Sequence, residues 1–296
     1  MKNWIQAMRL RTLPLAASCI LAGAAAAKTH GEINGFVLTL ILATTFLLQI
    51  LSNLANDYGD YSHGVDNEHR VGPTRALQSG AISQAQMKRA LIITTLLTLF
   101  TGMTLLWIVF SPRAQFVQAL LMLLLGVGAI AAAIRYTVGR KPYGYRGLGD
   151  LFVFLFFGPV GVLGTYFLLT GELDAEHLLL AMTTGFFSTA VLNLNNLRDH
   201  VNDAATGKQT LVVKMGFRKG KLYQIMLIIT GSLTLAGWII LNGQTAIAWL
   251  PALAAIAQCA LLSTVWKTDE PALLDPLLKK VALLTMLCAL ALFMTV

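Results

Sequence analysis

Two groups of asparagine and aspartate residues in this sequence have a spacing that places each group on one face of a helix. The first group comprises Asn53, Asn56, Asp57 and Asp60, and Asp66 follows shortly after it. Its first four positions are separated as i, i+3, i+4 and i+7, so their side chains would project from the same side of a helix. The spacing therefore predicts a row of oxygen ligands.

The second group, with the spacing i, i+4 and i+8, occurs in the other half of the chain. It comprises Asn195, Asp199 and Asp203. A single Asp at the end of a helix usually ends the helix and contacts water. Two such faces favour a binding function instead, because Asn and Asp are poor helix formers and carboxylates near a membrane cost free energy unless they are paired or liganded.

The residue types in the two groups are typical of a magnesium site. Mg²⁺ prefers oxygen ligands, keeps several waters and commonly bridges carboxylates to substrate phosphates. We therefore expect two opposed acidic faces to hold a diphosphate through Mg²⁺. The sequence has no Cys/His cluster with zinc spacing and no glycine-rich phosphate loop. Cys19, Cys259 and Cys288 lie within apolar runs and are predicted to be buried, inert thiols.

Basic residues and one tyrosine surround the acidic groups and are candidates for binding the diphosphate. These candidates are Arg70, Arg75, Tyr136, Arg140, Lys141, Arg198 and Lys208. Each cation alone is typical of a loop charge that fixes membrane topology. As a set they would neutralise a leaving diphosphate, which arginine binds through two parallel hydrogen bonds. The nearby histidines lack the spacing of a catalytic base, and we assign them no role.

The elements that carry these residues are predicted to be membrane-spanning helices. Of the 296 residues, 56% are hydrophobic and 12% are charged, whereas soluble domains contain about 25% charged residues. Continuous apolar stretches long enough to span a bilayer recur, and they favour helices over a barrel. The expected spans are 12–28, 35–56, 90–110, 116–135, 151–170, 178–197, 222–241, 245–266 and 279–296. We predict one all-α membrane domain, residues 1–296, with about nine transmembrane helices around a central cavity that opens to the cytoplasmic side.

The basic residues also predict the orientation of the chain. If the N-terminus is cytoplasmic, only Lys28 and Arg113 of the 22 Lys and Arg residues lie outside, as the positive-inside rule requires. The net charge of +8 is therefore assigned to cytoplasmic loops rather than to nucleic-acid binding. The predicted location is the inner, cytoplasmic membrane. The first span also resembles a signal peptide with an Ala-rich end at 24–27, but we expect it to be retained as a helix.

Both acidic groups resemble motifs of the UbiA superfamily of intramembrane prenyltransferases. The first motif, Asn-x-x-Asn-Asp-x-x-Asp, matches Asn53-Leu-Ala-Asn56-Asp57-Tyr-Gly-Asp60, and the second, Asp-x-x-x-Asp, matches Asp199-His-Val-Asn-Asp203. Many members carry a further Asp four residues after the position of Asp60. This chain has Gly64 there, and Asp66 is the nearest substitute.

Segments between the motifs resemble more narrowly the 1,4-dihydroxy-2-naphthoate prenyltransferases of menaquinone synthesis. These segments are Arg11–Pro14, Tyr136–Gly139, Pro142–Tyr145 and Gly147–Asp150; the stretches that contain or adjoin the motifs, Leu51–Asp60, Leu192–Asp199 and Gly207–Leu211, match as well. The last three spans add only hydrophobicity to the resemblance.

The resemblance implies a reaction between a polyprenyl diphosphate and the naphthoate. The implied Mg²⁺ site comprises Asp57, Asp60, Asp199 and Asp203, helped by Asn53, Asn56 and Asn195. Charge neutralisation would make the diphosphate a better leaving group. A ring carbon would attack the allylic carbocation and lose its carboxylate as CO₂, giving demethylmenaquinol, while the polyprenyl tail extends into the lipid bilayer.

Two alternatives stay open at the level of sequence. An enzyme that prenylates 4-hydroxybenzoate or another phenol would share both motifs. A transporter would also use intramembrane carboxylates, although transporter sites favour the membrane midplane and discontinuous helices, whereas both acidic groups lie at one end of the predicted spans. Asp150, where a short loop meets the fifth span, is predicted to be either a helix N-cap or a partner for a ring hydroxyl.

Overall fold

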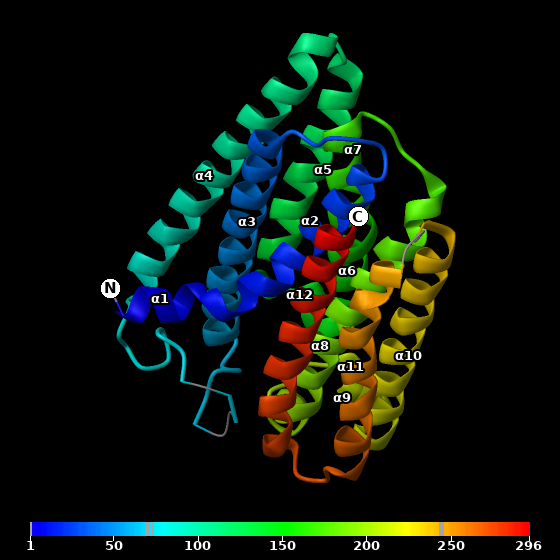
Figure 1. Cartoon of the computed structure of the whole chain (residues 1–296). Coiled ribbons are helices and arrows are strands. Elements are labelled where there is room, and N and C mark those ends of the chain that lie inside the picture. The colour runs from blue at the N-terminus through cyan, green and yellow to red at the C-terminus, as the bar shows by residue number, and fades with distance from the viewer. Residues whose placement is uncertain (1, 69–70, 73, 243–245) are drawn as a thin grey trace.

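The computed structural model of the chain is described for residues 2–68, 71–72, 74–242 and 246–296, and it contains no strand in these ranges. Its helices run antiparallel in one bundle (Figure 1). The α-helices are α1 (Lys2–Met8), α2 (Leu13–Lys28), α3 (Gly35–Ser62), α4 (Gln84–Phe110), α5 (Phe116–Arg135), α6 (Gly149–Leu155), α7 (Gly164–Thr170), α8 (Leu178–Ala205), α9 (Leu211–Met215), α10 (Phe217–Asn242), α11 (Leu250–Lys267) and α12 (Asp275–Thr295).

The membrane prediction is confirmed. Within the described residues, nine helical segments are long and apolar enough to cross a membrane. They coincide with the nine expected spans, but several of them are longer at their polar ends. α3 continues to Ser62 and α8 to Ala205, so the acidic residues predicted to end these spans lie on continuous helices.

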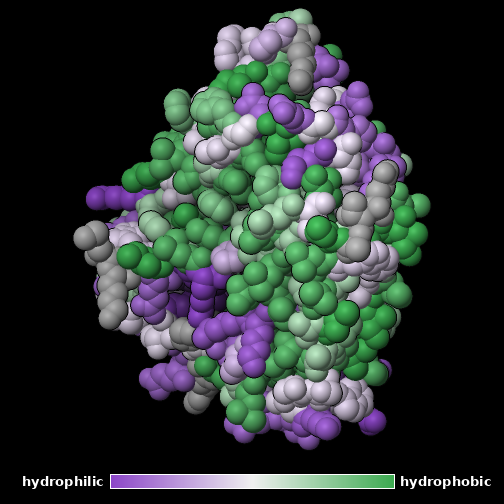
Figure 2. Space-filling view, viewed as in Figure 1, coloured by the Kyte–Doolittle hydropathy of each residue, from purple (hydrophilic) through white to green (hydrophobic). Residues whose placement is uncertain are grey.

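The bundle is built around α8, whose membrane-spanning segment is 72% buried. α8 packs against α6, α10 and α12, and α3 packs against α4 and α5. The space-filling view is hydrophobic over much of this face, as a lipid-facing surface requires, and it has a hydrophilic hollow between α1 and α12 (Figure 2). This face therefore combines an apolar, lipid-facing surface with an opening to polar groups inside the bundle.

The fifth span is interrupted by a π-helical segment, Phe156–Leu163, which separates α6 from α7. Pro159 lies inside this segment, where it lacks the N–H that an α-helical hydrogen bond needs. A Cβ on Gly158 would lie 2.7 Å from the carbonyl oxygen of Ala181, so glycine permits the close approach to α8. Such π-helical insertions are frequent at functional sites, and this one lines the central cavity.

α1 lies crosswise to α3 and α4 at the polar end of the bundle (Figure 1). Ala7 of α1 is buried in a small apolar cluster with Leu54 of α3 and Met87 of α4. The chain turns sharply after α1 at Arg9, and a short 3-10 turn, Leu10–Thr12, leads into α2. This corner brings the N-terminal segment against the first acidic group.

Candidate active site

The first acidic group lies on the last two turns of α3, where Asp57 and Asp60 are 1% and 2% exposed. Gly59, between them, allows α3 to approach the segment after α5, because a Cβ there would lie 2.5 Å from Oγ1 of Thr137. Thr137 donates a hydrogen bond to the carbonyl oxygen of Ala55 at 3.0 Å. The sequence Asp-Tyr-Gly-Asp thus combines two buried carboxylates with a close helix contact.

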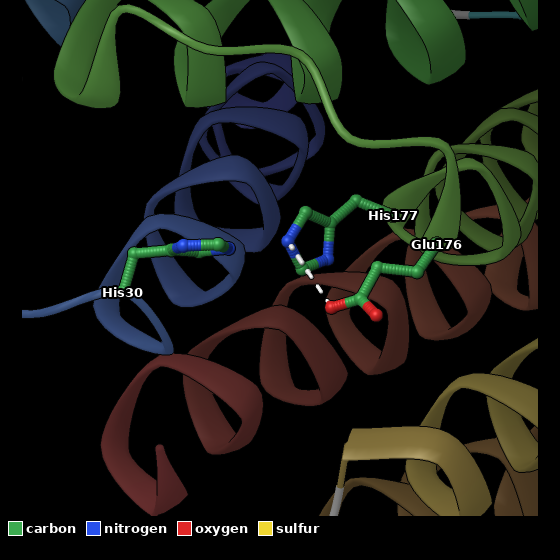
Figure 3. Close-up of side chains that lie close together, drawn as sticks. All are labelled: His30, Glu176 and His177. Atoms are coloured by element: carbon green, nitrogen blue, oxygen red, sulfur yellow. Dashed lines mark ion pairs between the residues drawn. The ribbon is translucent and has the colours of Figure 1, made fainter.

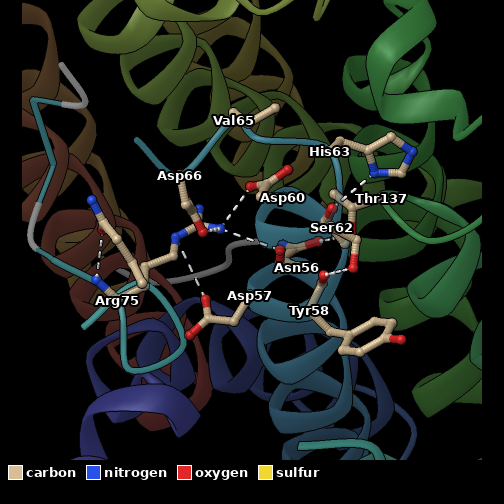
Figure 4. Close-up of polar contacts among 12 residues, drawn as sticks. Asn56, Asp57, Tyr58, Asp60, Ser62, His63, Val65, Asp66, Arg75 and Thr137 are labelled. Atoms are coloured by element: carbon tan, nitrogen blue, oxygen red, sulfur yellow. Dashed lines mark hydrogen bonds and ion pairs between the residues drawn. The ribbon is translucent and has the colours of Figure 1, made fainter. Parts of the chain in front are cut away.

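Arg75 gathers the carboxylates of this group, as Figure 4 shows. Its Nη1 lies 2.7 Å from Asp60 Oδ2 and 2.9 Å from Asp66 Oδ2, and its Nε lies 3.5 Å from Asp57 Oδ1. Burial alone would lower the pKa of Arg75, but these carboxylates raise it above its usual value. Arg75 therefore stays charged and holds three acidic side chains together.

Lys208 connects the two acidic groups. Its Nζ lies 3.6 Å from Asp60 Oδ1 on α3 and 3.9 Å from Asp203 Oδ1 on α8. Tyr145 donates a hydrogen bond to the same Asp60 oxygen at 2.7 Å, and Lys208 lies over its ring. Burial and the negative charge of Asp60 raise the pKa of Tyr145, so the phenol stays a donor. Residues far apart in sequence thus meet in one polar site.

The second group lies along α8 beside this site. Arg198 binds Asp199 through two hydrogen bonds, from Nε at 2.8 Å and from Nη2 at 2.6 Å. Its other contacts are to Asp275 Oδ1 at 2.5 Å and Asn195 Oδ1 at 2.8 Å. Asn202, on the same helix, donates to the carbonyl oxygen of Val65 at 3.0 Å. That bond fastens α8 to the loop after α3 and fixes the distance between the two groups.

A cavity of about 440 Å³ extends from this polar end into the apolar interior. Asp60, Arg75 and Lys208 line its polar end, whereas its other walls are mainly hydrophobic side chains of α2, α3, α4, α5 and α8. It reaches Leu105 of α4 and Leu168 of α7, near the opposite end of the bundle. Its shape suits a molecule with a charged head and a long apolar tail.

The structure brings most of the predicted site residues to this end of the cavity. The cavity is lined by Asn53, Asn56, Asp60, Arg75, Tyr136, Asn195 and Lys208. Asp57, Asp199, Asp203 and Arg198 are buried beside it. Arg140 and Lys141 are exposed and lie outside the cavity wall. Arg70 lies outside the described residues.

Two residues beyond the predicted metal and diphosphate ligands also belong to the site. Arg9 forms an ion pair with Asp57 and lines the cavity, although a basic residue just before the first span is typical of a charge that fixes membrane topology. Tyr145 is expected from the sequence to stack against the acceptor ring, but in the structure its hydroxyl contacts Asp60 directly. The signal for Arg9 is its place immediately before the Arg11–Pro14 segment, but the sequence does not show the left-handed backbone conformation at Arg9 that places its side chain against Asp57.

The interpretation of Asp150 as an N-cap is wrong. α6 begins at Gly149, and the residue before it is Leu148, so Asp150 lies inside the first turn. Its negative charge there still complements the positive end of the helix dipole. Its Oδ1 is buried and has no hydrogen-bond partner among the described residues.

A separate cluster of possible metal ligands lies at the other end of the bundle. It consists of His30, Glu176 and His177, whose ligand atoms are within 4.8 Å of one another (Figure 3). Trp238 donates its indole N–H to Nδ1 of His177 at 3.2 Å. The neutral imidazole therefore carries its proton on Nε2, the atom next to Glu176, where a metal would need a lone pair. This hydrogen bond argues against a metal at the cluster.

The chain belongs to the UbiA prenyltransferase family, whose model matches residues 16–294. The family match and the nine helical spans of the described residues make it a membrane prenyltransferase. It is 41% identical to a 1,4-dihydroxy-2-naphthoate octaprenyltransferase of Haemophilus influenzae over 97% of this chain and 93% of that protein. It is also 41% identical to the octaprenyltransferase of the same name from Escherichia coli K12, over 99% of this chain and 95% of the other.

Solved structures share the fold. A UbiA homolog from Archaeoglobus fulgidus bound to GPP and Mg²⁺ has a TM-score of 0.65 at 14% identity, with 99% of each chain covered. The apo structure of a UbiA homolog from Aeropyrum pernix has a TM-score of 0.66 at 16% identity and covers 90% of this chain and 94% of the other. These structures support the fold, and the resemblance predicted from the motifs is confirmed by the family match and by the two relatives of 41% identity.

Proposed function

We propose that this protein, as a single domain of residues 1–296, transfers a polyprenyl chain from its diphosphate to 1,4-dihydroxy-2-naphthoate, with loss of diphosphate and CO₂. The product would be demethylmenaquinol. One observation carries the proposal: Lys208 lies between Asp60 and Asp203 at the polar end of a long apolar cavity. The two relatives that are 41% identical over nearly the whole chain support the choice of acceptor.

The polar end fits a divalent metal by the chemistry of its donors. The residues proposed to hold Mg²⁺ are Asp57, Asp60, Asp199, Asp203 and Asn195. They supply only oxygen ligands, which Mg²⁺ prefers. Lys208 and Arg75 are held between these carboxylates, so positive charge is already stabilised at this place. When bound, Mg²⁺ would neutralise the diphosphate and improve it as a leaving group. The homolog from Archaeoglobus fulgidus bound to GPP and Mg²⁺ supports this cofactor.

The chain's own residues would position the reacting groups. Arg75 holds Asp57, Asp60 and Asp66 in one arrangement, and Tyr145 orients Asp60 by its hydrogen bond. Lys208 would turn its ammonium to the diphosphate, since it lines the cavity. Preorganised charges of this kind contribute much of the rate enhancement in enzymes that stabilise a leaving anion.

Aromatic side chains lie where an allylic cation would form. Tyr136, Tyr143, Phe152 and Phe156 line the cavity next to its polar end. Tyr143 and Phe152 are stacked with their ring centroids 4.1 Å apart. Burial raises the pKa of Tyr143, and burial together with the charge of Asp150 raises that of Tyr136, so both phenols stay neutral. Their faces would stabilise the cation and contact the ring of the acceptor.

Arg198 has a different role from the predicted contact with the diphosphate. Arg198 is bound to Asp199 and Asp275, so we assign it to the orientation of Asp199. The proposed contacts of Arg70, Arg140 and Lys141 stay predictions. A cytoplasmic N-terminus in the inner membrane is also proposed, because the basic loops surround the acidic end and the positive-inside rule places them in the cytoplasm.

Parallel assays with two acceptors test the proposed function. Purified enzyme is given a polyprenyl diphosphate and either 1,4-dihydroxy-2-naphthoate or 4-hydroxybenzoate, and prenylated product is quantified. We expect kcat/KM for the naphthoate to exceed that for the benzoate by at least about tenfold, which corresponds to about 1.4 kcal/mol in transition-state binding. Equal values would leave the family assignment intact and refute the choice of acceptor.

A further inference from the structure

The corner between α1 and α2 holds its backbone in an uncommon conformation. Arg9 has φ 48° and ψ 53°, the left-handed region that residues other than glycine rarely adopt. Such conformations cluster at ligand sites, where surrounding contacts hold them in place. The Arg9 side chain is 18% exposed, pairs with Asp57 and lines the polar end of the cavity. This backbone conformation thus points the Arg9 guanidinium into the active site.

The side chain of Asn53 fastens this corner on both sides of Arg9. Its Nδ2 donates to the carbonyl oxygen of Met8 and to Oγ1 of Thr12, both at 2.9 Å. Thr12 in turn donates to the carbonyl oxygen of Arg9 at 2.9 Å. The Oδ1 of Asn53 accepts from Gln49 at 3.3 Å. Both amide hydrogens and the amide oxygen of Asn53 are therefore used in contacts within the protein.

Further contacts fix α1 against the rest of the site. Gln6 donates to the carbonyl oxygen of Thr74 at 2.7 Å, the residue immediately before Arg75. Ala7 is buried against the Leu54 cluster on α3. The corner is therefore attached both to the helix that carries the acidic group and to the loop that supplies its main cation. A change at Asn53 would be transmitted to Arg9 rather than to a distant part of the fold.

We propose that Arg9 is a further diphosphate-binding residue and that Asn53 is its positioning residue rather than a ligand of the metal. The inference rests on the proposed function. Arginine carries five N–H donors, and the ion pair with Asp57 occupies only part of them, so the others are available to phosphate oxygens in the cavity. Asn53, the first Asn of the first motif, would then position the Arg9 guanidinium to bind the diphosphate.

The test is equilibrium binding of a non-reactive prenyl thiolodiphosphate to the full-length protein in detergent. Arg9→Ala should weaken binding by about tenfold, since it removes charge-assisted hydrogen bonds, and Arg9→Lys should weaken it less. Asn53→Ala should weaken it in the same direction. The double variant should bind no more weakly than Arg9→Ala alone, because Asn53 acts through Arg9. Thr12→Val, which removes one of the two anchors, should show a smaller loss.

Two further measurements separate this role from metal binding and from a general loss of structure. The Mg²⁺ concentration for half-maximal binding should be unchanged in Asn53→Ala, and amide hydrogen exchange over residues 8–12, measured without metal, should become faster. Arg11→Ala is the matched control, because Arg11 is exposed and lies outside the cavity wall; it should bind the analogue as the wild type does.

The inference is overturned if the losses of Arg9→Ala and Asn53→Ala add in the double variant, or if Asn53→Ala raises the Mg²⁺ requirement. It is also overturned if Arg9→Ala binds as tightly as the wild type. Failure of the wild type itself to bind the analogue would instead refute the proposed function.

Discussion

Replacing Arg75 by glutamine should destabilise the metal-free protein strongly. The substitution removes a side chain that is 10% exposed and pairs with Asp57, Asp60 and Asp66. Removing one partner of a buried ion pair typically costs about 3–5 kcal/mol, because the remaining charge is left uncompensated. For a protein of this size that loss corresponds to a decrease in Tm of about 10 °C. Repulsion among the three carboxylates would add to this loss, so a decrease in Tm of about 10 °C is the smallest that we expect.

Thermal unfolding of purified protein in detergent, with and without Mg²⁺, measures this effect. The variant should regain more of its Tm on addition of Mg²⁺ than the wild type gains, because the metal binds the carboxylates that Arg75 no longer neutralises. Arg218→Gln is the control, since Arg218 is exposed outside the cavity wall and surface substitutions usually change stability by less than about 0.5 kcal/mol. A metal-free Arg75→Gln protein that unfolds within about 1 °C of the wild type would refute the assigned role.

Three other changes test separate parts of the account. Asp57→Ala should nearly abolish turnover while the protein stays folded, and treatment of the wild type with EDTA should do the same. Added Mg²⁺ should restore the EDTA-treated wild type, and full activity in the chelator would contradict the metal site. Gly59→Ala should destabilise the protein by about 1–3 kcal/mol through overpacking against Thr137, which denaturant unfolding would measure, and an unchanged midpoint would contradict that close contact. In a variant without native cysteines, Ser79→Cys should react with an impermeant thiol reagent only from the cytoplasm and Ala175→Cys only from outside, and the reverse pattern would overturn the orientation.

The helices and the acidic faces could be predicted because their signals are local. Apolar stretches of bilayer length define the spans. The i, i+4 spacing of Asp199 and Asp203 places both side chains on the same face of any α-helix. The ends were less accurate. Asn and Asp disfavour helix, yet α3 continues to Ser62, where tertiary contacts such as those of Arg75 stabilise the last turns.

The cations that complete the site could not be predicted from local sequence. Arg75 and Arg140 are both basic loop residues near an acidic motif, but only Arg75 folds back against the carboxylates. That difference depends on long-range packing. Arg9 was missed because α1 lies crosswise to the spans. Asp150 was misassigned because helix boundaries from sequence are uncertain by a few residues.

The most direct test of the central claim is the stoichiometry of the reaction. Purified enzyme is incubated with a polyprenyl diphosphate and 1,4-dihydroxy-2-naphthoate labelled in its carboxyl group, and diphosphate, labelled CO₂ and prenylated product are measured together. The account predicts that all three form in equal amounts and that none forms in Asp57→Ala. A prenylated product that retains the labelled carboxylate, or diphosphate release without prenyl transfer, would contradict it.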